Sequence, residues 1–179
     1  MFDDRHVKDV TADSFGKGAE GRAALKFTGS ERIRLPLREW PMDTARIELE
    51  LAPEDAAGKV RSVIHRKGHG AAFTLKQLGD NRLEAVWSGI GKGGVWKVET
   101  ASRTAVTANV PLQPGRWTKV CLENDHRHIR ILLDGRLSGE VPFSTFRCHG
   151  PVSIFLGGGE DGCAGYRGHL RSLRVGPCR

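Results

Sequence analysis

The stretch from Leu156 to Val175, LGGGEDGCAGYRGHLRSLRV, crowds glycines around two acidic residues and a cysteine before an apolar alternation begins. Glycine-rich loops that bind phosphate through backbone N–H groups open a helix. Here the chain after Ala164 places apolar residues with a period of two and one phase slip, as a bulged β-strand does. We therefore predict a structural turn at one rim of the fold that leads into a final strand.

The rest of the chain shows similar short alternations. Its 179 residues suit one domain, and its 23 glycines and 8 prolines separate apolar runs without a sustained helical period. The segment HIRILLDGRLSGEV turns on Asp134-Gly135, a pair that accepts the positive φ angles of a tight hairpin. About a dozen short strands separated by turns predict an all-β protein, a two-sheet antiparallel β-sandwich of the jelly-roll kind.

Neighbouring strands are expected to pair as hairpins. AALKFTG and RIRLPL are separated by the turn GSE, and AAFTLKQLGDNRLEAVW contains two strands joined at 79–81. We also expect the strand at 152–156 to lie beside the strand at 166–175. The Glu160 and Asp161 loop would then join them at one rim.

Six segments in order resemble laminin G-like domains of the concanavalin A-like lectin and glucanase superfamily: ALKFTGSERIRLPL, ARIELELAPE, LQPGRWTKVCLE, IRILLDGRL, VSIFLGGG and YRGHLRSLRV. The resemblance runs from about Ala23 to Val175. We therefore predict one sandwich domain over 23–179, preceded by an N-terminal extension, 1–22, that packs on it or leads into it.

The resemblance implies a binding module for glycans or proteins. Calcium is common at the rim of such domains, where relatives often carry aspartates. This chain has Thr28 and Arg171 at those positions, and an arginine removes an oxygen ligand and adds like charge. We expect no metal there, and no cofactor.

The formal charge of +7 and the pI near 9.6 favour acidic partners. No run of five basic residues, zinc-finger spacing or RNA-reading aromatic motif is present, so nucleic acid is not the expected partner. The polar N-terminal segment MFDDRHVKDV predicts neither a secretion signal nor membrane insertion.

Two glycine-flanked loops and the rim turn supply the candidate ligand contacts. Basic loop residues would meet an acidic glycan, Trp96 would stack on a sugar ring, and acidic rim residues beside Tyr166 would bind hydroxyl groups. The predicted ligand-binding residues are Arg66, Lys67, Lys92, Trp96, Glu160, Asp161 and Tyr166.

Catalytic and zinc-binding interpretations are weaker. Glu48 and Glu50 lie two residues apart on one strand face, but a glucanase-type site places further acidic residues on that face. The alternation of polar and apolar residues in a strand with one solvent-exposed face explains both glutamates without catalysis. No CxxC or HExxH accompanies the histidines, which we expect to be exposed in loops: His65, His69, His126, His128 and His169. Trp117 is predicted to lie in the core.

The four cysteines allow three pairings. If the strands at 152–156 and 166–175 are antiparallel neighbours, Cys148 and Cys178 flank the same end, whereas Cys163 lies at the other. Cys121 is expected to be a small buried residue. The predicted disulfide is Cys148–Cys178, which would indicate an oxidising compartment; four reduced thiols in a cytosolic protein are the alternative.

The leading hypothesis is a non-catalytic, lectin-like carbohydrate-binding module, with acidic glycans among its expected ligands, in a larger extracellular, adhesive or cell-surface protein. A cytoplasmic location stays open. The first alternative is a structural or assembly subunit that contacts other proteins, and the second is a glycan-active hydrolase or lyase. The sequence names neither the ligand nor the oligomeric state.

Overall fold

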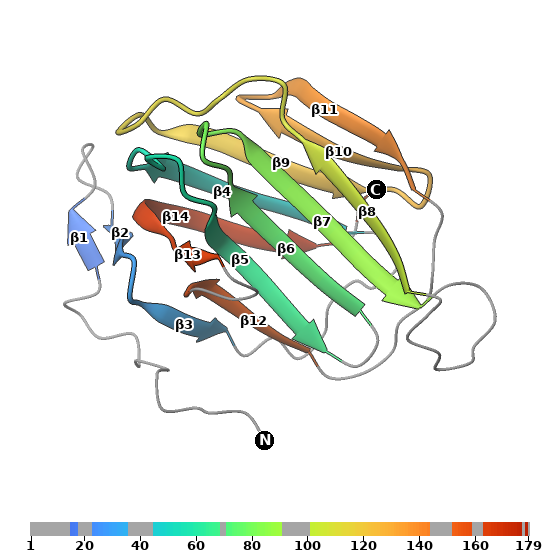
Figure 1. Cartoon of the computed structure of the whole chain (residues 1–179), viewed down its shortest axis with the longest axis horizontal. Helices are drawn as coiled ribbons and strands as arrows, with labels where there is room; N and C mark the ends of the chain where they lie inside the picture. Colours follow the sequence, from blue (N-terminus) through green and yellow to red (C-terminus); the bar gives the residue numbers. More distant parts are fainter. Residues whose placement is uncertain are drawn as a thin grey trace.

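The computed structural model describes residues 15–17, 23–35, 45–68, 71–90, 101–143, 152–158, 163–176 and 178. These residues form two antiparallel sheets packed face to face, as predicted (Figure 1). Sheet A contains, in spatial order, β1 (Phe15–Lys17), β2 (Ala23–Thr28), β14 (Arg167–Gly176), β4 (Ala45–Pro53), β9 (Thr118–Asn124), β10 (His128–Leu133) and β11 (Arg136–Pro142).

Sheet B lies in front of sheet A in Figure 1. Its strands follow the order β3 (Arg32–Leu35), β12 (Val152–Gly157), β5 (Arg61–Gly68), β6 (Ala71–Gln77), β7 (Leu83–Ile90) and β8 (Ala101–Thr107). The short strand β13 (Ala164–Gly165) pairs with β5 in parallel, apart from this path. No helix among the described residues has the length and apolar character needed to cross a membrane.

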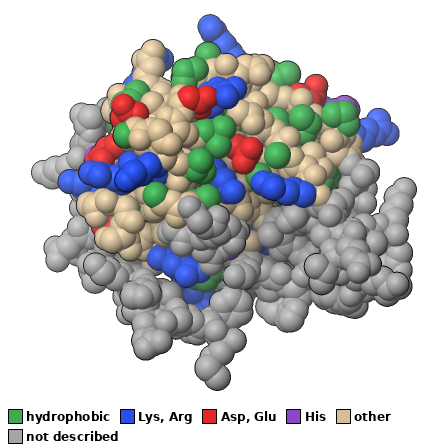
Figure 2. Space-filling view, viewed as in Figure 1, with side chains coloured by type: hydrophobic (Ala, Val, Ile, Leu, Met, Phe, Trp, Pro, Cys, Tyr) green, Lys and Arg blue, Asp and Glu red, His purple; other side chains and the backbone are tan. Residues whose placement is uncertain are grey.

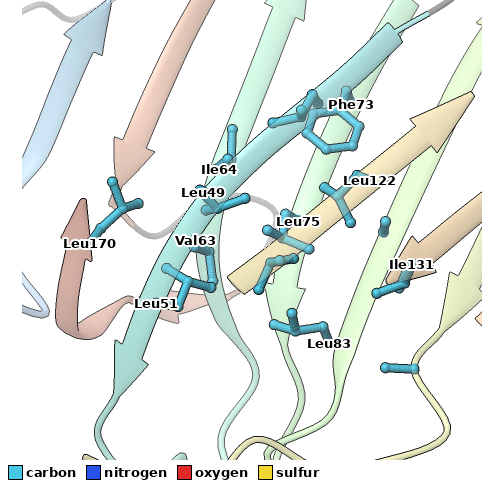
Figure 3. Packing of buried hydrophobic residues seen from close by; sticks show 14 of the residues in the cluster. Leu49, Leu51, Val63, Ile64, Phe73, Leu75, Leu83, Leu122, Ile131 and Leu170 are labelled. Carbon is cyan, nitrogen blue, oxygen red and sulfur yellow. The ribbon is translucent and has the colours of Figure 1, made fainter. Parts of the chain in front are cut away.

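The core fills the space between the sheets. Alternate residues of β4 point inward, among them Ile47, Leu49 and Leu51, which are at most 2% exposed. Leucines and isoleucines of the facing strands meet them (Figure 3). Burying such side chains contributes about 1.5 to 3 kcal/mol each. The alternation in the sequence therefore specifies which face of each strand is buried.

The hairpin between β10 and β11 confirms the turn predicted at Asp134-Gly135. Leu133 pairs with Arg136, and the two residues between them have φ angles of 50° and 79°. Strands with a right-handed twist are joined most readily by such a turn.

The predicted hairpin between the segments at 23–28 and 32–35 is wrong. β2 pairs with β1 and β14 in sheet A, whereas β3 pairs with β12 in sheet B. The Glu31 carboxylate accepts hydrogen bonds from the backbone N–H groups of Thr28, at 2.6 Å, and Gly29, at 3.2 Å. This compact turn carries the chain from one sheet to the other.

The strands on either side of the opening glycine-rich stretch also lie in different sheets. β12 pairs with β3 and β5, and β14 pairs with β2 and β4. The expectation that they are neighbours is therefore wrong. The phase slip is confirmed as an irregularity between Arg171 and Arg174, where Ser172 has a φ angle of 59°.

Glycines of this stretch permit close backbone contacts. A Cβ atom on Gly165 would lie 2.0 Å from the carbonyl oxygen of Gly29, and one on Gly168 would lie 2.5 Å from that of Ala52. Both distances are far below van der Waals contact. These two glycines are explained by packing between backbone segments, as expected for a structural turn.

Candidate functional site

Tyr166 lies in the core. Its residue exposure is 1%, its ring meets Phe27 edge-on at 5.7 Å, and its hydroxyl donates to the His169 carbonyl at 3.3 Å. Burial raises the pKa of the phenol. The predicted contact between Tyr166 and a ligand at the rim is therefore wrong, because the apolar alternation after the glycines places this ring between the sheets.

Arg66 and Lys67 belong to strand β5, so their prediction as loop residues is wrong. Arg66 is 4% exposed and pairs in register with the core residue Phe73, so it is not an exposed contact. Lys67 lies opposite Ala72, and its side chain is not among those described. Four predicted contacts lie outside the described residues: Lys92, Trp96, Glu160 and Asp161.

The outer face of sheet A carries charges of both signs that pair with one another. The Arg46 guanidinium lies 2.7 Å from a Glu48 carboxylate oxygen and 2.6 Å from one of Glu123. Arg130 pairs with Asp125 at 2.6 Å and with Glu140 at 2.5 Å. Ion pairs of this kind, within and between strands, neutralise part of the charge on this face.

A tighter cluster on the same face contains Glu50, Arg171 and Trp117. Arg171 Nε donates to Glu50 Oε2 at 2.6 Å, and its Cζ lies 4.1 Å from the centroid of the Trp117 ring. Trp117 is partly exposed, so its prediction as a core residue is wrong. Thr118, the next residue, is the one that points inward, opposite Leu51.

The outer face of sheet B has a different charge pattern. Arg34 and Arg103 are exposed, and Arg32 and Lys76 are partly exposed. We call these four residues the basic face. Figure 2 looks onto this side of the molecule and shows Lys and Arg side chains at several places on the described surface.

Few acidic residues lie close to the basic face. Within the described ranges, Glu84 is the one acidic residue on the outer face of sheet B, opposite Lys76 in register. No ion pair in the described part of the chain joins Arg34, Lys76 or Arg103 to a carboxylate. Exposed Lys26, Lys119 and Arg174 of sheet A likewise form no ion pair in the described part of the chain, so sheet B differs from sheet A in having fewer acidic residues.

One row of outward-facing residues crosses sheet B without an acidic member. Register places it in the order Arg34, Phe155, His65, Thr74, Val86 and Ala105. Arg32 stacks on this row, with its Cζ 4.2 Å from the centroid of the Phe155 ring. Such stacking restricts the orientation of the guanidinium.

The histidines occupy several kinds of position. His126 is exposed in the turn between β9 and β10, but His128 and His169 are partly exposed within strands. His65 is 4% exposed in β5, so its prediction as an exposed loop residue is wrong. His69 lies outside the described residues. In the described ranges, no three His, Cys, Asp or Glu side chains cluster in a way that could hold a metal ion.

Cys121, Cys163 and Cys178 are free and partly exposed in the structure. Cys148 lies outside the described residues. The Cys148–Cys178 disulfide stays a prediction, although β12 and β14 are not the neighbouring strands assumed in deriving it.

Sequence reasoning missed the basic face. Arg32 and Arg34 alternate with apolar residues in RIRL, a pattern that predicts an outward position for both. The pattern does not specify the neighbouring strands. Lys76 and Arg103 come from segments far along the chain, and only the strand order brings them onto the same face.

No family model matches the sequence, and no curated protein matches it. Solved structures do. Domain 4 of AbnA, an extracellular arabinanase from Geobacillus stearothermophilus, in complex with arabinotriose, has a TM-score of 0.65 and 17% identity over 90% of this chain and 73% of that one. The Ruminococcus gnavus sialidase CBM40 bound to α2,3-sialyllactose has a TM-score of 0.60 and 14% identity over 85% and 88%.

Domains LG4-5 of the mouse laminin α1 chain give a TM-score of 0.61 and 18% identity over 85% of this chain. The chain spans 40% of that laminin structure. At these identities the matches show the fold, which agrees with the arrangement of the two sheets. This chain has the concanavalin A-like lectin and glucanase fold, shared with laminin G-like domains and carbohydrate-binding modules.

Proposed function

We propose that this chain is a non-catalytic carbohydrate-binding module of an extracellular or cell-surface protein, and that its basic face binds acidic glycans. The observation that carries the proposal is the difference in acidic residues between the two outer faces. Sheet A carries Glu48, Glu50, Glu123 and Glu140, whereas the outer face of sheet B carries one acidic residue in the described ranges, Glu84, together with Arg34, Lys76 and Arg103. An unpaired cluster of one sign attracts a ligand of the opposite sign.

The similar structures support the ligand class. Two of them hold arabinotriose and α2,3-sialyllactose respectively. The fold therefore accommodates glycan binding in other proteins, and the charge of this chain favours acidic members of that class.

The non-catalytic part of the proposal rests on Glu48 and Glu50, the acidic pair considered for glycan hydrolysis. Each carboxylate is engaged by an arginine, Arg46 at 2.7 Å and Arg171 at 2.6 Å. A glycosidase needs one carboxylic acid that can donate a proton and a second carboxylate free to act on the sugar or on water. Two arginine-bound carboxylates do not provide that arrangement.

A glycan array containing neutral, carboxylated and sulfated glycans tests the proposal. We expect the wild-type protein to bind carboxylated or sulfated glycans, and the R34Q/K76Q/R103Q variant to lose at least tenfold in affinity. The control variant K26Q/R136Q/R174Q removes the same residue types and the same net charge from exposed positions of sheet A. It should retain most of the affinity.

The outcomes separate the alternatives. Equal losses in both triple variants would show that net charge, and not the basic face, causes binding. A silent array together with a stable oligomer in size-exclusion chromatography with light scattering would favour an assembly subunit. Turnover of β-glucans or alginates that disappears in E48Q would establish an enzyme.

A further inference from the structure

Trp117 presents a partly exposed indole on the outer face of sheet A. The Cζ atom of Arg171 lies 4.1 Å from the centroid of the ring, over one of its two faces. Arg171 as a whole residue is 7% exposed, whereas Trp117 retains more access to solvent. The ring therefore covers the guanidinium, and the exposed surface of the indole lies on the side turned away from Arg171.

Neighbouring side chains hold this ring in place. Arg171 is itself fixed by Glu50, whose Oε2 atom accepts a hydrogen bond from Arg171 Nε at 2.6 Å. The centroid of the His169 ring lies 6.3 Å from that of the indole. His169 is opposite Ala52 in register, and Ala52 is 5% exposed although it lies on the outer face. An aromatic ring that is ordered in advance loses little conformational freedom when a ligand packs on it.

The indole N–H of Trp117 is available to a ligand. It donates to no group among the described residues, and it is not one of their buried polar atoms without a partner. The nitrogen is therefore in contact with solvent. A ligand on this ring can meet an apolar surface and a hydrogen-bond donor at the same time.

A second donor lies beside the ring. Lys119 is exposed on the same face of sheet A, two residues along the chain from Trp117, which corresponds to about 6.5 to 7 Å between the Cα atoms. The ammonium group of Lys119 forms no ion pair in the described part of the chain. Because Glu50 offsets the charge of Arg171 beneath the ring, the packing surface itself requires no anionic group on the ligand.

These features match the chemistry of a neutral sugar ring. A gluco-configured pyranose has equatorial hydroxyl groups and directs C–H bonds above and below the ring, so both of its faces are flat and apolar. We propose that such a ring, in a neutral β-glucan oligosaccharide, packs on the exposed side of Trp117 and accepts hydrogen bonds from the indole N–H and from Lys119. The inference rests on the proposed function for the glycan class of the ligand, and it adds a second site, on the opposite sheet, with a different specificity.

NMR titration of the isotope-labelled protein with cellotetraose and with laminaritetraose tests the proposal. The indole N–H signal of Trp117 is identified by its absence from the spectrum of W117F. We expect this signal to shift in a saturable manner in the wild-type protein, with an affinity in the millimolar range. W117A should lower the affinity about tenfold or more, because it removes the packing surface, and K119Q should lower it about two- to threefold. Thermal unfolding establishes that each variant is folded.

The R34Q/K76Q/R103Q variant is the control, since it changes the basic face and leaves Trp117 and Lys119 in place. It should bind the neutral oligosaccharides as the wild-type protein does, and added salt should have little effect on that binding. A Trp117 signal that stays unchanged with both oligosaccharides in the folded wild-type protein would overturn the inference. Binding that W117A retains, or that the control variant loses, would overturn it as well.

The two proposals fail separately. Loss of the neutral site leaves the binding of acidic glycans by the basic face untouched, because that binding is measured with other ligands and other variants. A shift of the Trp117 signal with neutral oligosaccharides, together with no binding of acidic glycans, would support the inference and contradict the proposed role of the basic face.

Discussion

Arg171 of β14 and Glu50 of β4 form a nearly buried ion pair on the outer face of sheet A. Their side chains are 6% and 16% exposed, and Arg171 Nε lies 2.6 Å from Glu50 Oε2. The Trp117 ring covers one side of the guanidinium. The pair joins two central strands across a ladder position, Arg171 opposite Glu50, that directly precedes the irregularity in β14. Removing either partner would take away an opposite charge at 2.6 Å from a group that has little access to water.

We therefore expect E50Q to lower the free energy of unfolding by about 3 kcal/mol. The matched control is E48Q, two residues away on the same strand face. Glu48 and Arg46 have side-chain exposures of 42% and 46%, so loss of that pair should cost less than about 1 kcal/mol. Urea denaturation of the two variants measures the difference. Equal losses of unfolding free energy in E50Q and E48Q would mean that the Arg171–Glu50 pair stabilises the fold no more than the exposed Arg46–Glu48 pair does.

More of the fold than of the candidate site could be predicted from the sequence. Alternation in ARIELELAPE and the Asp134-Gly135 turn are local features, so the buried faces and the β10–β11 hairpin could be predicted from them. Assignment of β2 and β3 to different sheets depends on β1, β12 and β14, which are non-local partners. A short turn such as GSE serves equally well within one sheet or between two.

The misplaced site residues have a similar cause. Arg66 and Lys67 adjoin glycine in the sequence, which favours a loop, but β5 continues to Gly68 because β6 and β12 both pair with its end. The net charge favours an acidic ligand but does not indicate where on the fold it would bind. Only the order of the strands could indicate that Arg34 and Arg103 share a face.

Gly165→Ala should destabilise the fold by about 3 kcal/mol, because overpacking a tight contact forces backbone shifts. The added Cβ would lie 2.0 Å from the Gly29 carbonyl oxygen. The control Gly176→Ala adds a methyl group with no atom within 4 Å. Thermal and urea denaturation compare the two variants. A Gly165→Ala protein as stable as the control would show that the rim readily relaxes around the added methyl group.

The stability of the protein should fall as the pH is lowered from about 4 to about 2, partly because of Asp125. Partial burial would raise its pKa, but hydrogen bonds from the backbone N–H groups of His128 and Arg127, together with Arg130, lower the pKa from 3.8 to about 2. Because folding lowers the pKa of Asp125, this carboxylate stabilises the folded protein fully at pH values above its pKa in the unfolded chain. That stabilisation is lost as the pH falls and Asp125 becomes protonated in the folded protein. In the Asp125→Asn variant the free energy of unfolding, measured by urea denaturation, should fall less between pH 4 and pH 2 than it does in the wild type. An unchanged slope would exclude this carboxylate as a source of the acid sensitivity.

Glu84→Gln should strengthen binding of acidic glycans about 1.4- to 5-fold, which corresponds to the roughly 0.2 to 1 kcal/mol typical of exposed charge interactions. Glu84 lies opposite Lys76 and is the one acidic residue among the described outward positions of sheet B. The gain should be largest at low ionic strength, since added salt screens exposed charges. Calorimetric titration at two salt concentrations measures both effects. A loss of affinity would indicate that Glu84 accepts hydrogen bonds from the ligand instead of repelling it.

Cys121 should resist alkylation in the folded protein. Burial, the largest influence, raises the pKa of its thiol to about 11, although nearby Arg46 acts in the opposite direction. Because the thiolate is the reacting species, iodoacetamide at pH 8 should label Cys121 much more slowly in the folded protein than in urea. Mass spectrometry of the digested protein gives the labelling rate at each cysteine. Equal labelling of Cys121 in both conditions would show that strand β9 opens to solvent on the timescale of the reaction.

The same digest prepared without reductant tests the predicted Cys148–Cys178 disulfide. Free thiols at both Cys148 and Cys178 after air oxidation would contradict the disulfide, and with it the support that the disulfide gives to an extracellular location.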